Sequence, residues 1–402
     1  MHAAICAMME MTMAEFDAYM PDNPELVSGM RNLGHRRPTE IQELVFADIR
    51  DGGDVLIQAP TGTGKTLAYL CPLFARYREA MGENKVIVLT PTHELAIQVA
   101  KQVRALAEKS GLRYHASVIV GDVQIGRQVE ALKGKPEFIV GTAGRILELI
   151  EKRKIAANLV RTVVLDEGDR LFDEHHREST HAVIKKCLRD RQLVVASASI
   201  SAKAKEELAQ WTDHAKLVAA AGGQGLPANI KHWYVVVPEE REKIEMLRGT
   251  TGAIRTKRAM IFINRNYDIE QAAEKLRHHH YTVDSLYGKR TKEERRDAMQ
   301  AFRSGKVKYL IASDMAARGL QIDDVDTVFH LSIPEDPADY LHRAGRCGRA
   351  GRVGRNLAIV TEREVRKLHA YEKALGIHFS RKYYEGGKLL DKPVKTEKQS
   401  ET

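Results

Sequence analysis

The 402-residue sequence has few cysteines, few aromatic residues and no long apolar segment. It has only four cysteines: Cys6, Cys71, Cys187 and Cys347. They lie far apart without a CxxC pair, which argues against a disulfide framework or a zinc site and favours a reducing, cytoplasmic setting. No apolar run approaches the ~20 residues of a transmembrane helix, so no membrane partner is expected. The 43% hydrophobic and 29% charged residues are ordinary for a globular protein and exclude global disorder.

The two ends of the chain differ from the middle. The short apolar stretch in residues 1–13 lacks a preceding basic region, so a secretory signal is not expected. Several methionines there favour a true translation start near Met11 or Met13, and we expect residues 1–13 to be disordered. Residues 383–402, which are polar and without aromatics from Gly386 on, are expected to form a flexible tail.

Short apolar runs alternate with stretches of helical periodicity in two segments of the chain. Such runs suit strands buried on both faces, and their alternation with helices predicts parallel sheets. An uncharged stretch rich in glycine and alanine, 219–227, separates the two segments. The sequence therefore predicts an α/β fold with two tandem parallel-sheet domains, 14–218 and 230–382, joined by a short linker at 219–229. The runs are 55–57, 86–89, 118–120, 138–140, 163–165 and 193–195, then 234–237, 260–263, 309–312, 327–329 and 357–360.

A phosphate-binding loop follows the first run. The stretch Ala59–Thr66 matches the GxxxxGK[ST] pattern except that alanine replaces the first glycine. Backbone N–H groups of such a loop and the following helix N-terminus bind phosphate oxygens, which predicts ATP as the ligand. Lys65 is expected to reach the β- and γ-phosphates, and Thr66 to ligate Mg²⁺. The predicted nucleotide-binding residues of the loop are Thr61, Gly62, Thr63, Gly64, Lys65 and Thr66.

Two further motifs fit chemistry on a bound triphosphate. Asp166 and Glu167 follow the run 163–165, where a carboxylate at a strand end can hold Mg²⁺, partly through water, and its neighbour can orient the attacking water. The stretch His342–Gly351 carries arginines interrupted by glycines. Arginines of one domain could neutralise charge on a nucleotide bound by the other, which would make hydrolysis depend on domain closure.

Together these motifs resemble those of the DEAD-box RNA helicases of helicase superfamily two, in family order over about residues 14–370. The resemblance implies two RecA-like domains and an RNA-stimulated ATPase. Gly34–Gln42 resembles the adenine-reading Q motif, which implies that Gln42 pairs with the adenine edge. Phe16, further upstream, is expected to stack on the base.

The remaining motifs carry over residue by residue. Pro91–Ala96 resembles PTRELA, Thr142–Arg145 resembles TPGR, and 313–321 resembles TDVAARGLD. The resemblance implies RNA contacts by Pro91, Thr92, His93, Gly121, Thr142, Gly144 and Arg145, and in the second domain by Asn264, Arg295, Ser313 and Asp314. It implies interdomain coupling through Asp169, Ser197, Ser199, Arg318 and Gly319, and a nucleotide contact by Gln321. By the HRxGRxGR match, Arg346 and Arg349 are the expected arginine fingers and His342 the interdomain sensor.

The chain departs from the family pattern at RNA-contact and coupling positions, while the hydrolytic residues are retained. The replacements are His93 for Arg, Asp122 for Gly, Ala143 for Pro, Gly168 for Ala, Ser199 for Thr, Lys292 for Gln and Gln321 for Asp. We therefore expect retained ATPase activity with altered RNA affinity or coupling. Asp122 would place a carboxylate near RNA phosphate, which Lys292 could partly offset.

Three functions fit these residues. The first is a monomeric ATP-dependent helicase acting on structured RNA; the stretch Gly386–Leu389 resembles short bacterial members linked to large ribosomal subunit assembly and cold growth, which implies ribosomal RNA or pre-ribosomal particles. The second is an RNA-binding clamp or assembly factor with slow, weakly coupled turnover, motivated by the replacements. The third is a DNA translocase of the same superfamily, which the Q-motif match disfavours.

The net charge is unevenly distributed. Residues 1–227 carry 29 basic and 29 acidic side chains, residues 228–382 carry 30 and 21, and the last 20 residues carry 4 and 4. The whole excess of +9 therefore belongs to the second domain. We expect this domain to supply much of the electrostatic attraction to RNA, with salt-sensitive binding.

Overall fold

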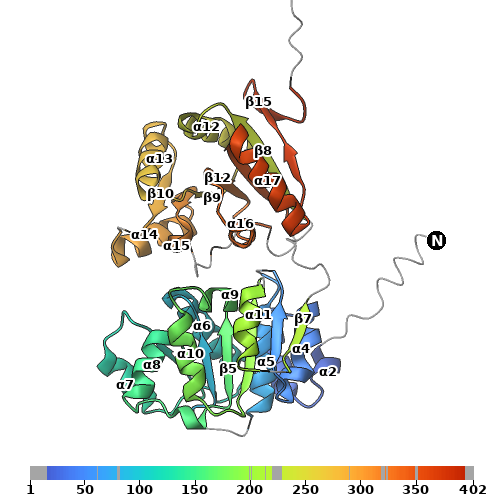
Figure 1. Cartoon of the computed structure of the whole chain (residues 1–402), viewed down its shortest axis with the longest axis vertical. Helices are drawn as coiled ribbons and strands as arrows, with labels where there is room; N and C mark the ends of the chain where they lie inside the picture. The colour runs from blue at the N-terminus through green and yellow to red at the C-terminus, as the bar shows by residue number, and fades with distance from the viewer. Residues whose placement is uncertain are drawn as a thin grey trace, which may run out of the picture. The chain divides into compact units, whose positions relative to one another are not determined.

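The structure, a computed structural model of the whole chain, describes residues 16–60, 62–78, 82–198, 200, 202–212, 214–219, 229–288, 290–317, 322, 325–348 and 352–393. The chain divides into two units, Met1–Gly223 and Gln224–Thr402, so the boundary lies within the expected linker (Figure 1). The expected disordered segment 1–13, most of that linker and residues 394–402 lie outside the described residues.

Domain one contains a parallel sheet with helices on both faces. Seven strands among its described residues pair in the order β3-β4-β2-β5-β6-β1-β7. The strands are β1 (Val55–Gln58), β2 (Val86–Leu89), β3 (Ala116–Ile119), β4 (Phe138–Gly141), β5 (Thr162–Asp166), β6 (Gln192–Ser197) and β7 (Lys216–Ala219). The helices are α2 (Phe16–Tyr19), α3 (Pro24–Asn32), α4 (Glu40–Arg50), α5 (Lys65–Arg76), α6 (His93–Ser110), α7 (Ile125–Leu132), α8 (Ala143–Glu151), α9 (Gly168–Leu171), α10 (Arg177–Lys186) and α11 (Ala202–Ala209), with the 3-10 turn η1 (Ala157–Leu159).

Domain two repeats this architecture. Its described residues form a second parallel sheet of seven strands in the order β10-β11-β9-β12-β13-β8-β14. These are β8 (Ile230–Val237), β9 (Ala259–Phe262), β10 (Val283–Leu286), β11 (Tyr309–Ala312), β12 (Thr327–His330), β13 (Gly354–Thr361) and β14 (Phe379–Arg381). The helices are α12 (Lys243–Ile254), α13 (Asn266–His278), α14 (Lys292–Arg303), α15 (Asp314–Ala317), α16 (Pro337–Ala344) and α17 (Glu362–Leu375), and the 3-10 turn is η2 (Glu240–Glu242). Two tandem parallel-sheet domains confirm the predicted fold class.

Both sheets are buried on both faces, as their apolar strands predict. In domain one, one core cluster joins the sheet to α3, α4, α5 and α6, and another joins it to α8, α10 and α11. The central strands β1, β2, β4, β5 and β6 are buried at every position. Within the described residues, no helix has both the length and the apolar character that spanning a membrane requires.

The expected flexible tail is wrong for its first part. Tyr383–Glu385 (β15) and Lys388–Leu390 (β16) form an antiparallel hairpin that packs on α12 (Figure 1). A Cβ added at Gly249 of α12 would lie 2.5 Å from the ring of Tyr384, and Leu389 packs on a core cluster of the domain. The aromatic and apolar residues in this otherwise polar segment are thus what order it.

Candidate functional site

The predicted site residues lie at one edge of each sheet. In domain one the phosphate loop follows β1, Pro91 follows β2, Gly121 comes after β3, and Thr142 follows β4. In domain two the motif residues follow β9 and β11. Because parallel strands all end at the same edge, each domain gathers its motifs at its carboxyl edge, which is where ligands bind in open α/β sheets.

The phosphate loop has the conformation that its glycines allow. Gly62 and Gly64 adopt φ angles of +87° and +89°, which disfavour residues with a Cβ. The Nζ of Lys65 donates to the carbonyl oxygens of Ala59, at 2.5 Å, and Pro60, at 2.9 Å. The lysine therefore lies over the loop. When a phosphate binds there, Lys65 would donate to the charged phosphate oxygens in place of these carbonyls.

Gln42 lies against the phosphate loop. Its Nε2 donates to the carbonyl oxygen of Gly64 at 3.2 Å, and its Oε1 accepts from the backbone N–H of Thr39 at 3.0 Å. A Cβ at Gly64 would lie 2.5 Å from that Nε2, so glycine also makes this close contact possible. The expected adenine reader and the phosphate loop are thus hydrogen-bonded to each other.

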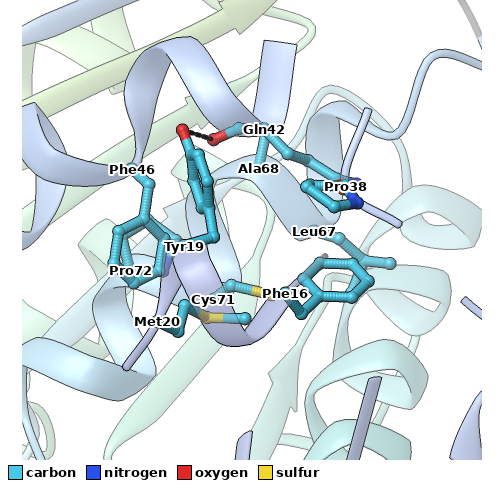
Figure 2. Close-up of a pocket in the computed structure, with 10 residues that line it drawn as sticks. All are labelled: Phe16, Tyr19, Met20, Pro38, Gln42, Phe46, Leu67, Ala68, Cys71 and Pro72. Carbon is cyan, nitrogen blue, oxygen red and sulfur yellow. Dashed lines mark hydrogen bonds between the residues drawn. The ribbon is translucent and has the colours of Figure 1, made fainter. Parts of the chain in front are cut away.

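Phe16, the residue expected to stack on the base, is buried. It is 2% exposed and belongs to the core of domain one, and its stacking role stays a prediction. Figure 2 shows it in an apolar pocket with Leu67 and Cys71 among the lining residues. In the same pocket the hydroxyl of Tyr19 donates to the backbone oxygen of Gln42 at 3.5 Å. Phe16 therefore lines the same pocket as Gln42 and Phe46 of α4.

Asp166 is a buried carboxylate with fixed partners. It is 4% exposed; its Oδ2 accepts from the hydroxyl of Tyr69 at 2.8 Å and its Oδ1 from the N–H of Glu167 at 3.0 Å. Burial raises the pKa of Asp166 above its usual range, although the Tyr69 hydrogen bond and the charge of Lys65 oppose this shift. An oxygen donor set of this kind fits Mg²⁺, which prefers carboxylate ligands and retained waters.

Glu167 has a strained backbone. Its φ of +54° and ψ of +52° place it in the left-handed region, which costs a non-glycine residue about 1–2 kcal/mol. Such strain concentrates at functional sites. Glu167 lies at the junction of β5 and α9, between the buried Asp166 and Asp169, the residue expected to couple the domains.

The acidic motif is linked to the end of β6. The Ser197 hydroxyl donates to Asp169 Oδ1 at 2.6 Å, and the Ser197 carbonyl accepts from the N–H of Ala59 at 3.1 Å. One buried serine thus touches both the acidic motif and the first residue of the phosphate loop. The replacement Gly168 also has a steric reason, because an added Cβ would lie 2.5 Å from Cγ1 of Val195 on β6.

The expected RNA residues of domain one contact each other. His93 begins α6, and its Nδ1 lies 2.8 Å from Asp122 Oδ2. Arg145 on α8 donates to the carbonyl oxygens of Gly121, at 2.6 Å, and Val123, at 2.9 Å. The guanidinium expected to contact RNA therefore holds the turn that carries Asp122. The other expected contacts, Pro91, Thr92, Thr142 and Gly144, lie in the segments that open α6 and α8.

One buried arginine organises the carboxyl edge of domain two. Arg343 on α16 is 2% exposed. It donates to both carboxylate oxygens of Asp314, at 2.5 and 2.6 Å, to Asn264 Oδ1 at 2.7 Å and to the Ser332 carbonyl at 2.6 Å. The side chains of Asn264 and Asp314, expected to contact RNA, are thus engaged within the domain.

The other expected residues of domain two occupy the same edge. The Ser313 hydroxyl accepts from the N–H of Ala316 at 3.4 Å, and Arg295 donates to the Ala316 carbonyl at 3.5 Å, so both hold α15. His342 is half-buried on α16, which ends at Ala344, and Arg346 follows in a turn with 9% exposure. Within the described residues, the arginine-containing stretch that starts at His342 is thus helical only as far as Ala344.

Six predicted residues lie outside the described part of the chain: Thr61, Ser199, Arg318, Gly319, Gln321 and Arg349.

Two residues of the site were not predicted from the sequence. Tyr69 could have been found from its place four residues after Lys65 on the same helix, which puts both on one face. Arg343 lies inside the quoted arginine motif, but no sequence signal separates a buried arginine from one that contacts a ligand.

Comparison with known proteins agrees with this geometry. The DEAD/DEAH box helicase family model matches residues 39–208, and the helicase conserved C-terminal domain matches residues 242–351. The chain is 36% identical to the probable ATP-dependent RNA helicase YfmL of Bacillus subtilis, over 89% of this chain and 94% of that protein. It is also 36% identical to the DEAD-box ATP-dependent RNA helicase CshC of Bacillus cereus, over 94% of this chain and 95% of that protein. The structure of S. cerevisiae Dbp5 bound to RNA and ADP BeF3 superimposes with a TM-score of 0.79, at 26% identity, over 89% of this chain and 93% of that one.

Proposed function

The chain belongs to the DEAD-box ATP-dependent RNA helicases, and from this premise we propose that it remodels structured RNA or RNA–protein particles by ATP-driven closure of its two domains. The observation that carries the proposal is the hydrogen-bonded series at the carboxyl edge of domain one. In it the loop of Lys65, the carboxylate of Asp166 and the Asp169–Ser197 pair lie at the carboxyl ends of the adjoining strands β1, β5 and β6.

The proposed nucleotide site uses this edge. The loop from Thr61 to Thr66 takes the phosphates, with Lys65 leaving its carbonyl partners for them. Gln42 pairs with adenine, and its hydrogen bond to Gly64 links the adenine site to the phosphate loop. Asp166 and the Thr66 hydroxyl would hold Mg²⁺, which supplies charge neutralisation on the phosphates when it is bound. Glu167, held in its strained backbone, orients the attacking water.

Closure is proposed to complete the site. Arg346 and Arg349 are assigned as the fingers that stabilise charge on the transferred phosphate, and His342 as the sensor of the facing domain. Ser197, through Asp169, couples the acidic motif to this movement, together with Ser199, Arg318, Gly319 and Gln321. By linkage, RNA tightens ATP binding as much as ATP tightens RNA binding.

RNA is proposed to bind along the carboxyl edges of both domains through its backbone. The charge of +9 in residues 228–382 supports a strong electrostatic contribution from domain two. A hollow at the ends of β9 and β12 is lined by four basic side chains and two acidic ones, which gives that edge a net positive lining. They are Arg241, Lys243, Arg265 and Lys275, and Glu240 and Asp268.

The experiment is an ATPase assay with and without RNA, combined with unwinding of a short duplex. We expect RNA to stimulate hydrolysis and the duplex to separate only with hydrolysable ATP. Retention of RNA on a non-hydrolysable analogue with little turnover would instead establish the clamp. Stimulation by DNA as strong as by RNA would establish the DNA translocase.

For the natural substrate, we propose ribosomal RNA in assembling large subunits, acted on by a monomeric enzyme in the cytoplasm. The resemblance of Gly386–Leu389 to short bacterial helicases of that group supports the substrate, and the buried free thiols of Cys71, Cys187 and Cys347 support a reducing compartment. Crosslinking in cells followed by sequencing of the bound RNA tests it. Enrichment of messenger or small-subunit RNA would overturn this assignment without affecting the helicase activity.

A further inference from the structure

Two of the residues in which this chain departs from the family pattern are bonded to each other. His93 replaces an arginine and Asp122 a glycine, 29 residues apart in sequence. The imidazole Nδ1–H donates to the carboxylate at 2.8 Å. The departures therefore form a matched pair between α6 and the turn after β3, which neither residue alone would suggest.

The turn that carries Asp122 is held rigidly. Arg145 donates to the carbonyls of Gly121 and Val123. Gln128, which is 2% exposed, donates from Nε2 to Val120 O at 2.7 Å and to Val123 O at 3.0 Å. Four hydrogen bonds thus fix the backbone on both sides of Asp122, so its carboxylate is presented to α6 from a defined position.

The imidazole ring of His93 folds over this turn. A Cβ built on Gly121 would lie 3.7 Å from Nε2 and 3.8 Å from Cε1 of His93, so the ring covers the glycine. The ring therefore stands where an RNA backbone would have to approach Gly121. The side chains of His93 and Asp122 are 31% and 47% exposed, so the pair is solvated and can open at small cost.

We propose that His93 and Asp122 form a latch over the RNA-binding turn of domain one, which RNA opens by exchanging a phosphate for the carboxylate. Asp122 thereby sets the RNA affinity of the chain by competing with RNA for the hydrogen-bond donor of the side chain at position 93. This inference rests on the proposed RNA site at the carboxyl edge. It explains both replacements at once, since the carboxylate that would repel RNA accepts a hydrogen bond from His93 when RNA is absent.

A double-mutant cycle in the full-length chain tests the latch. The variants are Asp122→Ala, His93→Arg and the two combined, with binding of a fluorescein-labelled single-stranded RNA measured by anisotropy in a non-hydrolysable ATP analogue. Asp122→Ala should tighten binding two- to five-fold. His93→Arg alone should change affinity less than two-fold, because the guanidinium stays paired with Asp122. The double variant should bind at least ten-fold tighter than the unmodified chain.

The salt dependence of RNA binding gives a second readout. The loss of a negative charge elsewhere on the surface should not change it. A freed arginine adds one phosphate contact, so the slope of log K against log salt should steepen by about 0.7 in the double variant. Glu130→Ala, which removes an exposed acid on α7 paired with Lys133, is the matched charge control, alone and with His93→Arg. Its effects should be additive and its slope should equal that of its parent.

The outcomes separate the latch from the proposed function. Additive effects in the Asp122–His93 cycle, or weaker binding by Asp122→Ala, would overturn the latch while the unmodified chain still binds RNA and hydrolyses ATP. If the unmodified chain binds no RNA, the proposed RNA site itself is wrong. Circular dichroism of each variant confirms that the fold is retained.

Discussion

The two domains share a sheet order but hold their carboxyl edges together in different ways. In domain one, contacts are dispersed among neighbours: Lys65 with Pro60, Ser197 with Asp169, His93 with Asp122. In domain two a single side chain, Arg343, bonds groups that follow β9, β11 and β12. In domain one, two paired residues can be replaced together without disturbing the other pairs. In domain two, a replacement of Arg343 removes the hydrogen bonds of all its partners at once.

The largest effect that this comparison predicts is at Arg343. Arg343→Ala would leave the Asp314 carboxylate and the Ser332 carbonyl without their donor, and breaking a buried ion pair costs about 3–5 kcal/mol. We expect the free energy of unfolding of domain two, measured by urea denaturation, to fall by that amount. Arg248→Ala, which removes an exposed pair with Glu245, should leave the free energy of unfolding almost unchanged. Equal losses in the two variants would mean that Arg343 has no central role.

The next effect concerns catalysis in domain one. Lys65→Ala and Glu167→Gln should each lower the RNA-stimulated kcat by about 10²–10³-fold, because the first removes the proposed phosphate ligand and the second the group proposed to orient the attacking water. The exposed Lys101→Ala on α6 serves as the control and should keep the activity. Near-normal hydrolysis by either site variant, in a steady-state phosphate-release assay, would remove the proposed mechanism.

A steric pair tests whether domain one accepts compensated changes. Gly168→Ala brings a Cβ to 2.5 Å from Cγ1 of Val195, and overpacking of this kind costs about 1–3 kcal/mol. The stiff, branched valine cannot easily turn away. We expect Gly168→Ala to cost less in the background of Val195→Ala, which removes that methyl group. Unfolding free energies of the four proteins in the cycle measure the coupling, and strict additivity would show that the contact does not matter.

The sequence predicted most of the fold because its central strands are continuous apolar runs, a signal of strands covered on both faces. The strands that it missed lack this signal. Lys216–Ala219 is an edge strand with one buried residue, and Val283–Leu286 contains Asp284 and Ser285. The hairpin Tyr383–Leu390 was missed because its order comes from packing on α12, which no local pattern records.

The candidate site shows the same division. Motif spacing placed the phosphate loop, Asp166 and Ser197 at the ends of their strands, since strand–loop–helix order is local information. Side-chain partners between distant segments were beyond it. The burial of Phe16, which the resemblance assigned to the base, was not predicted, and neither was the burial of Arg343, which stayed unassigned. The pairing of His93 with Asp122 likewise requires β3 and β2 to lie on either side of β4.

The smallest predicted effect is a gain in stability when Asp166, a residue of the proposed hydrolytic site, is replaced by asparagine. Burial raises the pKa of Asp166, so the folded chain holds that proton more readily than the unfolded chain. Its ionised form therefore opposes folding at neutral pH, and this cost disappears as the pH falls through the raised pKa. Asp166→Asn removes the charge, keeps the shape and should stabilise the ligand-free chain by about 0.5–2 kcal/mol at neutral pH while abolishing hydrolysis.

The pH dependence of that gain isolates its cause. Urea unfolding at neutral and mildly acidic pH should show the advantage of Asp166→Asn shrinking as the unmodified chain takes up its proton. The exposed Asp190→Asn provides the control and should show no gain at either pH. A gain in stability that is constant with pH would show that its cause is the packing around Tyr69. A loss of stability would mean that the contacts of domain one depend on the Asp166 carboxylate as strictly as those of domain two depend on Arg343.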